Sequence, residues 1–357
     1  MKELTAKRAV PALPVAGSFR SIDFALSSMS NSHIQTVAVL TQYNARSLNE
    51  HLSSSKWWNF GRKQGGLFLF TPTVTADNSD WYRGTADAMY QNIDFLKRRH
   101  EPYVIISSGD CVYKLDFNRV LDFHIEKKSD ITVVCKDMMY NDDVSRFGVV
   151  RMDDESRITE FDEKPIEALS NTISTGIYVI RRRQLIELLE AAAEENRFDF
   201  VNDILVRYKN VKKIYGYKIN SYWNNIADID AYFKTNMDFL RPDVRSYFFR
   251  EEPTICSKVD DLPPAKFNPG SDISNSLVSS GCIINGSVED SVLFKQVFVG
   301  KNTTVKNCVI LNDVYIGDNV HLENCIVESR GTINPNTCYC GEDGVMIVKE
   351  KNVRYVI

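Results

Sequence analysis

The chain has 357 residues, of which 43% are hydrophobic and 25% are charged, and its formal net charge is −4. This length suggests about two domains, each large enough to bury its own core. Lys and Arg (43) nearly balance Asp and Glu (47), so we expect no nucleic-acid partner. No apolar run approaches the ~20 residues of a membrane helix, and the first residues lack a signal-peptide pattern, so we expect a cytoplasmic protein with no membrane partner.

The first two thirds of the chain alternate short apolar runs with amphipathic stretches. Strands are predicted at 36–40, 103–107, 131–134 and 176–180, and helices at 22–29, 86–99, 117–127 and 183–195. This alternation is typical of an α/β fold with a mostly parallel, Rossmann-type sheet, and it predicts one domain over residues 1–240. Ligands of such folds bind beyond the carboxyl ends of the strands.

The pattern changes after residue 240. A connecting segment is predicted over residues 241–270, where prolines interrupt a stretch of little periodicity. Beyond it, residues 290–300 align without a gap with residues 307–317, which is an offset of 17 residues.

Aliphatic residues recur within this repeat about every six positions, as at Ile310, Ile316 and Leu322. Three six-residue sides make one triangular coil, whose inward side chains stack on those of the next coil. Residues 271–357 are therefore predicted to form a left-handed parallel β-helix of hexapeptide repeats.

The eight cysteines and five histidines are scattered, and no two cysteines have the Cys-x-x-Cys spacing. The scattered positions of these residues predict neither a zinc site nor a disulfide framework, and we expect no histidine-based metal site. The closest pair, Cys338 and Cys340, is interpreted as two reduced thiols.

Two motifs near the front of the chain are candidates for ligand binding. Arg20 follows a loop fixed by two prolines and a glycine, and its guanidinium is a candidate clamp for phosphate or carboxylate, although a structural pair with Asp23 explains it equally well. Gly84 permits close backbone approach to a ligand, and the helix after it would direct free N–H groups there. Trp81 and Tyr82 would pack beside a base or brace the loop.

Two further motifs lie deeper in the domain. Asp110 follows the predicted strand 103–107, where a carboxylate can hold Mg²⁺ on phosphate oxygens or cap the next helix. Lys164 stands beside Pro165 in a fixed turn and is a candidate contact for an anionic substrate.

In this order the motifs resemble bacterial glucose-1-phosphate adenylyltransferase (ADP-glucose pyrophosphorylase). The matching strings are residues 20–24, 81–88, 109–110, 147–149, 163–165, 176–178, 222–223 and 263–267, together with the closing hexapeptides. The resemblance implies a nucleotidyltransferase-like fold that makes ADP-glucose and pyrophosphate from ATP and glucose 1-phosphate with Mg²⁺, in glycogen synthesis. It implies Arg20 and Asp110 as catalytic residues, with Asp110 on the metal. It also implies a set of substrate-binding residues: Gln42, Trp81, Tyr82, Gly84, Thr85, Ala86, Gly148, Glu163, Lys164, Ser174 and Gly176.

Three departures from the family pattern accompany these matches. Members of the family carry a strand and a glycine-rich phosphate loop before the pair that is Leu4-Thr5 here, and we expect that loop to be absent from this chain. Val10 stands where the family has a lysine, and Asn225 stands where it has a second metal-binding aspartate. The Mg²⁺ site is therefore expected to be incomplete, with Asp110 alone.

This pattern resembles the regulatory D-type subunit of the family. Our main hypothesis is a catalytically weak or inactive subunit that raises the activity of a catalytic ADP-glucose pyrophosphorylase subunit in a hetero-oligomer, with glucose 1-phosphate, ATP or ADP-glucose as ligands. Three alternatives remain open: an active adenylyltransferase, a hexapeptide acyltransferase with His321 as base, and an assembly module that binds no ligand. The fold alone does not choose among them.

Overall fold

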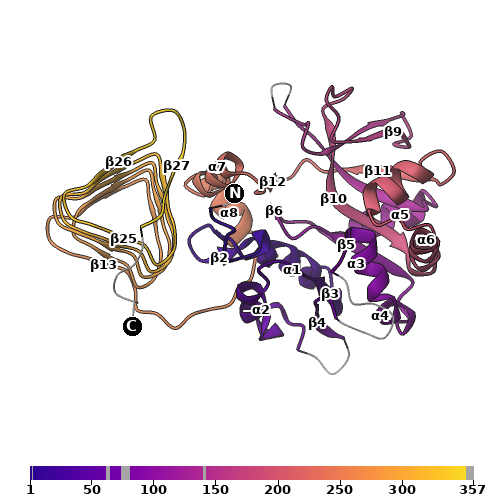
Figure 1. The fold of residues 1–357 in the computed structure, drawn as a ribbon, viewed down its shortest axis with the longest axis horizontal. Helices are drawn as coiled ribbons and strands as arrows, with labels where there is room; N and C mark the ends of the chain where they lie inside the picture. The colour runs from indigo at the N-terminus through magenta and orange to yellow at the C-terminus, as the bar shows by residue number, and fades with distance from the viewer. Residues whose placement is uncertain (2, 62–64, 74–80, 140–141, 351–357) are drawn as a thin grey trace.

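The computed structural model describes residues 1–357 except 2, 62–64, 74–80, 140–141 and 351–357 (Figure 1). An α/β domain and a triangular β-solenoid lie side by side along the long axis, with helices α7 (Ile229–Asp238) and α8 (Pro242–Phe249) between them. None of the helices in the described ranges is long and apolar enough to cross a membrane.

The α/β domain follows the predicted order of strands and helices. Its other elements are β1 (Pro14–Val15), β2 (Phe19–Arg20), α1 (Ser21–Asn31), β3 (Thr36–Leu40), α2 (Arg46–Leu52), β4 (Gly66–Phe70), α3 (Thr85–Gln91), α4 (Ile93–Lys97), β5 (Tyr103–Ser107), β6 (Cys111–Tyr113), α5 (Phe117–Glu126), β7 (Ile131–Asp137), β8 (Gly148–Met152), β9 (Ile158–Glu163), β10 (Thr172–Arg181), α6 (Arg182–Glu194), β11 (Ile214–Lys218) and β12 (Trp223–Asn225), with short helical turns η1 (Val10–Ala12), η2 (Ser55–Trp58) and η3 (Val201–Val206). The predicted strands are confirmed as β3, β5, β7 and β10.

The expected α/β class is confirmed, but the main sheet is mixed where a mostly parallel one was predicted. Its order is β11-β7-β10-β8-β9, with β5 also paired to β10. Strand β10 runs antiparallel to β5, β7 and β8, β8 runs antiparallel to β9, and among the described strands of this sheet β11 and β7 are the one parallel pair. The short connection between β8 and β9 suits antiparallel neighbours, whereas parallel neighbours need a longer crossover. Strand β10 lies between β7 and β8 and pairs antiparallel with both.

The helix predicted over 86–99 is two helices, α3 and α4, separated at Asn92. The Asn92 side chain donates to the carbonyl oxygen of Ala88 at 2.9 Å and to the hydroxyl of Tyr82 at 3.0 Å. An asparagine that bonds back to the preceding turn competes with the helical backbone pattern, and this accounts for the break. The other predicted helices are confirmed as α1, α5 and α6.

The second domain is a parallel β-helix, as predicted from the repeat. Its strands are β13 (Lys266–Phe267), β14 (Asp272–Ser274), β15 (Leu277–Val278), β16 (Ile283–Ile284), β17 (Ser287–Glu289), β18 (Val292–Leu293), β19 (Phe298–Val299), β20 (Thr304–Lys306), β21 (Val309–Ile310), β22 (Tyr315–Ile316), β23 (His321–Glu323), β24 (Cys325–Val327), β25 (Thr332–Ile333), β26 (Cys338–Cys340) and β27 (Met346–Val348). They form three sheets of five parallel strands, one on each side of the triangle seen in Figure 1.

The strand pairing confirms the spacing of the repeat. Val288 pairs with Val305 and Val305 with Leu322, which are 17-residue steps. All three side chains are buried in the interior of the coil, so one apolar column runs along the solenoid.

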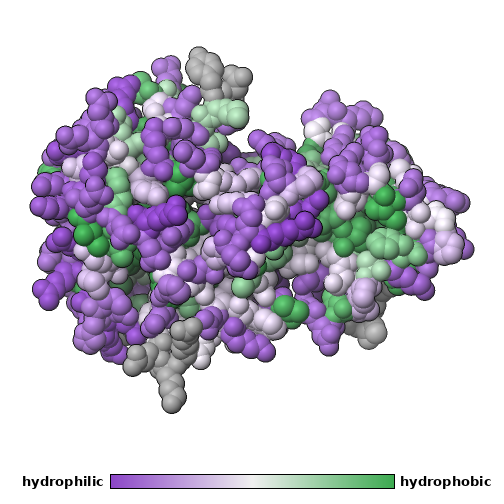
Figure 2. All heavy atoms as spheres, turned by 180° about the vertical axis from the view of Figure 1, so that it is seen from behind, coloured by the Kyte–Doolittle hydropathy of each residue, from purple (hydrophilic) through white to green (hydrophobic). Residues whose placement is uncertain are grey.

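A shared apolar cluster joins the two domains. Phe239 of α7's C-terminal end and Phe248 of α8 pack in it together with Phe294 and Leu311 of the solenoid. Ser279 donates to the carbonyl oxygen of Gly17 at 2.9 Å, and this bond ties the first solenoid turns to the loop at the start of the chain. Figure 2 shows the surface indented between the two domains. The segment 241–270 contains α8 and β13, with irregular chain between them.

Candidate functional site

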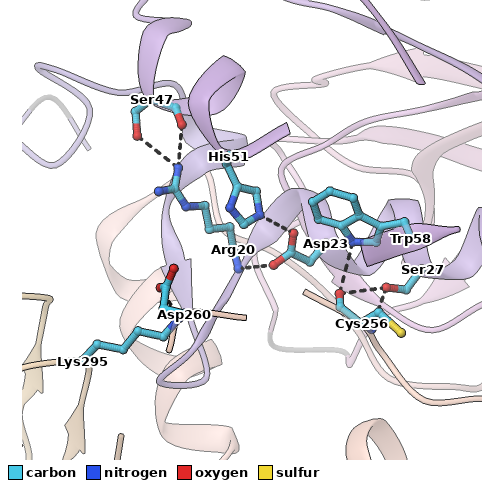
Figure 3. Close-up of polar contacts among 9 residues, drawn as sticks. All are labelled: Arg20, Asp23, Ser27, Ser47, His51, Trp58, Cys256, Asp260 and Lys295. Atoms are coloured by element: carbon cyan, nitrogen blue, oxygen red, sulfur yellow. Dashed lines mark hydrogen bonds and ion pairs between the residues drawn. The ribbon is translucent and has the colours of Figure 1, made fainter. Parts of the chain in front are cut away.

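Arg20 lies at the start of α1 and is held by local contacts (Figure 3). Its guanidinium donates to the carbonyl and hydroxyl oxygens of Ser47 at 2.8 and 3.0 Å, and its backbone N–H donates to Asp23 at 2.8 Å. Burial lowers the pKa of the guanidinium, and the Asp23 carboxylate opposes that shift. Asp23 is therefore a partner of the Arg20 backbone and the guanidinium is held by Ser47, while the role of Arg20 as a phosphate clamp stays a prediction.

Asp23 connects this corner to the neighbouring helix. Its buried carboxylate lies 2.6 Å from Nε2 of His51 on α2. One turn further along α1, Ser27 donates to the carbonyl oxygen of Cys256 at 3.1 Å, and Trp58 donates to the same oxygen at 3.2 Å (Figure 3). The connecting chain is thus fastened to the α/β domain close to the candidate site.

The Trp81–Tyr82 stretch is braced by Gln42. The Gln42 side chain accepts from the backbone N–H of Tyr82 at 2.6 Å and donates to its carbonyl oxygen at 3.2 Å. Trp81 is 61% exposed and stacks on Tyr43 with ring centroids 5.6 Å apart. Of these three predicted site residues, Gln42 and Tyr82 hold the loop, and Trp81 presents an aromatic face to solvent.

A close backbone neighbour leaves no room for a side chain at Gly84. A Cβ at this position would lie 2.3 Å from the carbonyl oxygen of Phe198. The same oxygen accepts from the N–H groups of Ala86 and Asp87, and Thr85 accepts from the N–H of Phe200 at 2.9 Å. The prediction that this helix start directs free N–H groups at a ligand is therefore wrong for these two groups, because a protein carbonyl already occupies them.

Gly148, Glu163 and Lys164 lie together on the β8–β9 hairpin. Gly148 pairs directly with Glu163 in the strand register, and the Lys164 ammonium lies 3.7 Å from the Glu163 carboxylate. Burial raises the pKa of Glu163, Lys164 opposes that shift, and Asp199 adds to it. A half-buried carboxylate beside an exposed ammonium can accept from hydroxyl groups and pair with an anion on the same ligand.

Ser174 and Gly176 lie on β10 where its register is interrupted. The Ser174 hydroxyl is 3.2 Å from the Tyr178 hydroxyl, and Gly176 adopts a positive φ of 75°. The carbonyl oxygen of Gly176 accepts from the N–H of Ser108 at 3.1 Å. This bond places the β10 irregularity beside the carboxyl end of β5, next to Asp110.

Asp110 and Asn225 come together through the pairing of β6 and β12. Asn225 lies opposite Cys111, and the backbone N–H of Ile226 donates to the carbonyl oxygen of Asp110 at 2.9 Å. One carboxylate oxygen of Asp110 accepts the Ser108 hydroxyl at 2.5 Å. These residues supply one carboxylate at the position where the resemblance implies two.

Both polar atoms of the Asn225 side chain are hydrogen-bonded to other protein groups. Its side-chain oxygen accepts from the N–H of Ala227 at 2.9 Å, and its amide nitrogen lies 3.5 Å from the sulfur of Cys111. The amide therefore presents hydrogens, and not a lone pair, toward the Asp110–Cys111 corner. The residues present do not fit a Mg²⁺ site built on two carboxylates.

Val10 begins the turn η1, next to the same corner. Pro11, the next residue, packs closely on Gly109, because a Cβ added to Gly109 would lie 3.2 Å from the Pro11 ring. The Val10 side chain packs against the apolar cluster that joins the two domains. The position that would hold a lysine in the family is thus part of an apolar contact.

A chain of hydrogen bonds therefore links three of the predicted residues, Asp110, Gly176 and Ser174. It runs from Asn225 and Asp110 through Ser108, Gly176 and Ser174 to Tyr178. Burial raises the pKa of the Tyr178 hydroxyl, and the Glu163 carboxylate adds to that shift. Tyr178 and Asp199, which neighbour these residues, were not among the predicted ones. Tyr178 lies within the matched string 176–178, but no local pattern marks Asp199, which the fold brings near Glu163 from a distant turn.

Two family models match the chain, in the order of its two domains. The "Nucleotidyl transferase" model covers residues 1–241, and the "GlmU-like, C-terminal hexapeptide" model covers residues 263–347. These ranges coincide with the α/β domain and the β-helix.

Several relatives of known name are similar to the chain over most of its length. It is 38% identical to the glucose-1-phosphate adenylyltransferase of Geobacillus stearothermophilus, over 98% of this chain and 90% of that protein. It is 38% identical to the protein of the same name from Clostridium novyi (strain NT) and 37% identical to that from Bacillus subtilis (strain 168), each over 85% of this chain and 80% of the relative. With this identity and coverage, the chain belongs to the glucose-1-phosphate adenylyltransferase family.

Proposed function

We propose that this chain is a catalytically weak, regulatory subunit of ADP-glucose pyrophosphorylase in glycogen synthesis. It would bind the sugar phosphate or the nucleotide sugar and work beside a catalytic subunit in a hetero-oligomer. The observation that carries the proposal is the side chain of Asn225, which turns its amide toward the Asp110 corner in place of a second carboxylate.

The loss of this charge bears on the metal-dependent half of the reaction. Mg²⁺ in nucleotide sites is held by one or two carboxylates together with the phosphates of the substrate. With Asn225 bonded to Ala227, Asp110 would face the triphosphate alone. Val10 removes a further positive charge from the same corner, and one lost charge contact of this kind typically costs ~10²–10³ in rate.

The sugar side of the site supports retained ligand binding. Glu163, Lys164, Ser174 and Gly176 stand at the positions that the resemblance assigns to substrate contacts. Glu163 ends β9 and Lys164 follows it, while Ser174 and Gly176 lie on β10 of the same sheet, with β8 between the two strands. The Glu163 carboxylate is suited to accept from sugar hydroxyls, and the Lys164 ammonium is suited to pair with a phosphate. In a subunit that binds ligand without fast turnover, ligand binding can be coupled to the activity of a neighbouring subunit.

The first test restores the two lost groups. We expect low release of pyrophosphate from ATP and glucose 1-phosphate by the full natural gene product, and a gain of ~10²-fold or more in the double variant Val10→Lys/Asn225→Asp. The matched control is Val10→Lys/Asn224→Asp, which adds the same charges but places the carboxylate on the neighbouring residue. Wild-type turnover at the level of active relatives, or equal gains in both double variants, would contradict the proposal.

The second test concerns the partner. The chain should be co-expressed with the catalytic adenylyltransferase subunit of the same organism, and the complex should be compared with that subunit alone. We expect higher activity or a stronger effector response, with a coupling of ~1–3 kcal/mol. A mixture that behaves like the catalytic subunit alone would exclude the regulatory role, whatever ligands the chain binds.

The second candidate function is that of an active glucose-1-phosphate adenylyltransferase. It is favoured by the relatives that carry this name and are 37–39% identical to this chain. The wild-type measurement in the first test separates the two candidates.

A further inference from the structure

Four side chains that can ligate a metal meet on the outer face of the last solenoid turns. His321 and Glu323 lie on β23, and Cys338 and Cys340 lie on the parallel neighbour β26. In the strand register, His321 is opposite Cys338 and Glu323 is opposite Cys340. Side chains alternate along a strand, and Leu322 points into the coil, so the residues on either side of it face outward.

The ligand atoms of three of these side chains lie close enough to share one ion, and the fourth, Cys338, lies beside Cys340. The two cysteine sulfurs are 3.6 Å apart, and Nε2 of His321 is 3.5 Å from the Glu323 carboxylate. The ligand atoms of His321, Glu323 and Cys340 all lie within 4.8 Å of one another. A tetrahedron with Zn–S bonds of ~2.3 Å and Zn–N bonds of ~2.0–2.1 Å has edges of ~3.3–3.8 Å.

We propose that His321, Glu323 and Cys340 form a binding site for a divalent transition metal of the Zn²⁺ type, with Cys338, whose sulfur lies 3.6 Å from that of Cys340, turning in as the fourth ligand. Two thiolates and an imidazole select such an ion over Mg²⁺ or Ca²⁺, which prefer oxygen ligands. Four protein ligands complete a tetrahedral shell, which is the arrangement of a structural site. The ion would fasten β26 to β23 near the end of the solenoid.

The surroundings permit an ion to enter. The side chains of His321 and Glu323 are 43% and 39% exposed, and Cys338 is exposed. The nearest cation in the same column is Lys306 of β20, which is in register with Glu323. The Lys306 ammonium lies 3.6 Å from the carboxylate of Glu289, which is on the other neighbouring strand, β17. The Glu323 carboxylate therefore faces the His321 and Cys340 side chains.

This site could not be recognised in the sequence, because its two halves are separated by one coil. His321 and Cys338 are 17 residues apart, and only the winding of the β-helix places them side by side. Familiar zinc motifs are recognised by cysteines and histidines a few residues apart. The earlier expectation of no histidine-based metal site relied on that short spacing.

The test is a metal titration of the reduced, metal-stripped full chain. We expect Co²⁺ to bind at about one ion per chain, with thiolate-to-cobalt charge-transfer absorption and the intense visible bands of a tetrahedral ion, and Zn²⁺ to displace it. The double variant Cys338→Ser/Cys340→Ser should lose these bands, and His321→Ala should weaken binding by more than the ~10–100-fold typical of residues that only support a ligand. Zn²⁺ should also raise the melting temperature of the wild type but not of the double variant.

Cys256→Ser is the matched control, because Cys256 is an exposed cysteine far from this cluster in the sequence. It should bind Co²⁺ as the wild type does, and circular dichroism should show that every variant is folded. The proposal is wrong if reduced wild type gives no charge-transfer absorption. It is equally wrong if the double variant keeps the absorption or if Cys256→Ser loses it.

Discussion

At the scale of single residues, the candidate site depends on close backbone contacts as much as on charged groups. The carbonyl oxygen of Phe198 accepts two N–H groups at the start of α3 and lies against the Cα of Gly84. The residues predicted to receive a ligand, Thr85 and Ala86, are thus fixed by a loop more than 100 residues later, since Thr85 is bonded to Phe200 across a separation of 115 positions. A small change at Gly84 should therefore affect the fold before it affects any ligand.

The variant Gly84→Ala tests this contact. Its new Cβ would lie 2.3 Å from the Phe198 oxygen, so the backbone must move, and we expect a loss of ~1–3 kcal/mol in the free energy of unfolding. Gly61→Ala is the control, because its nearest neighbour would be a serine hydroxyl at 3.9 Å. Denaturant unfolding measures both, and equal stability of the two variants would show that the Phe198 contact is not rigid.

At the scale of elements, the solenoid turns at residues in the left-handed backbone region. Asn302, Asn319 and Asn336 occupy one corner in successive coils with φ of 54°, 54° and 61°. Their amides form a ladder, with Asn302 donating to Asn319 at 3.3 Å and Asn319 donating to Asn336 at 3.0 Å. Asparagine suits this corner for two reasons, its tolerance of positive φ and its stacked hydrogen bonds.

Two substitutions of Asn319 separate these reasons. Asn319→Ala loses both the ladder bonds and the favourable backbone preference, and we expect it to destabilise the solenoid by about 1–2 kcal/mol. Asn319→Gly loses only the ladder bonds and should be the more stable of the two. Thermal unfolding compares them, and a glycine variant as unstable as the alanine variant would assign the effect to the ladder.

The elements also show which features of the fold follow from local sequence. The repeat could be predicted with its register, because each coil repeats the same apolar positions at 17 residues and Val305 pairs where that offset puts it. The direction of the strands in the α/β domain could not be predicted in this way. An apolar run such as 176–180 has the same sequence pattern whether its neighbouring strands are parallel or antiparallel to it. For the candidate site, motifs in the sequence mark Glu163 and Asp110, but the rotation of the Asn225 amide toward Cys111 and the approach of Asp199 to Glu163 depend on residues far away in the chain.

At the scale of the whole molecule, the two domains share one apolar cluster and an ion pair. Arg8, near the start of the chain, pairs with Glu328 of the solenoid, and Phe294 is buried among residues of α7 and α8. The first residues of the α/β domain thus lie between the candidate site and the β-helix. A proposed regulatory subunit needs such a connection, because a change on one domain must reach the other through packed contacts.

Phe294→Ala tests whether the two domains unfold as one. The side chain is 1% exposed and belongs to the cluster shared by the two domains, and its removal should cost ~3–5 kcal/mol. We expect one cooperative transition in wild-type calorimetry and a lower, divided transition in the variant, as the solenoid and the α/β domain lose their coupling. Phe298→Ala is the control, since Phe298 stacks on Tyr315 on the outer face of the solenoid at 4.8 Å and is not part of the shared cluster. If both variants lower the melting temperature equally and neither divides the transition, the cluster around Phe294 does not couple the two domains.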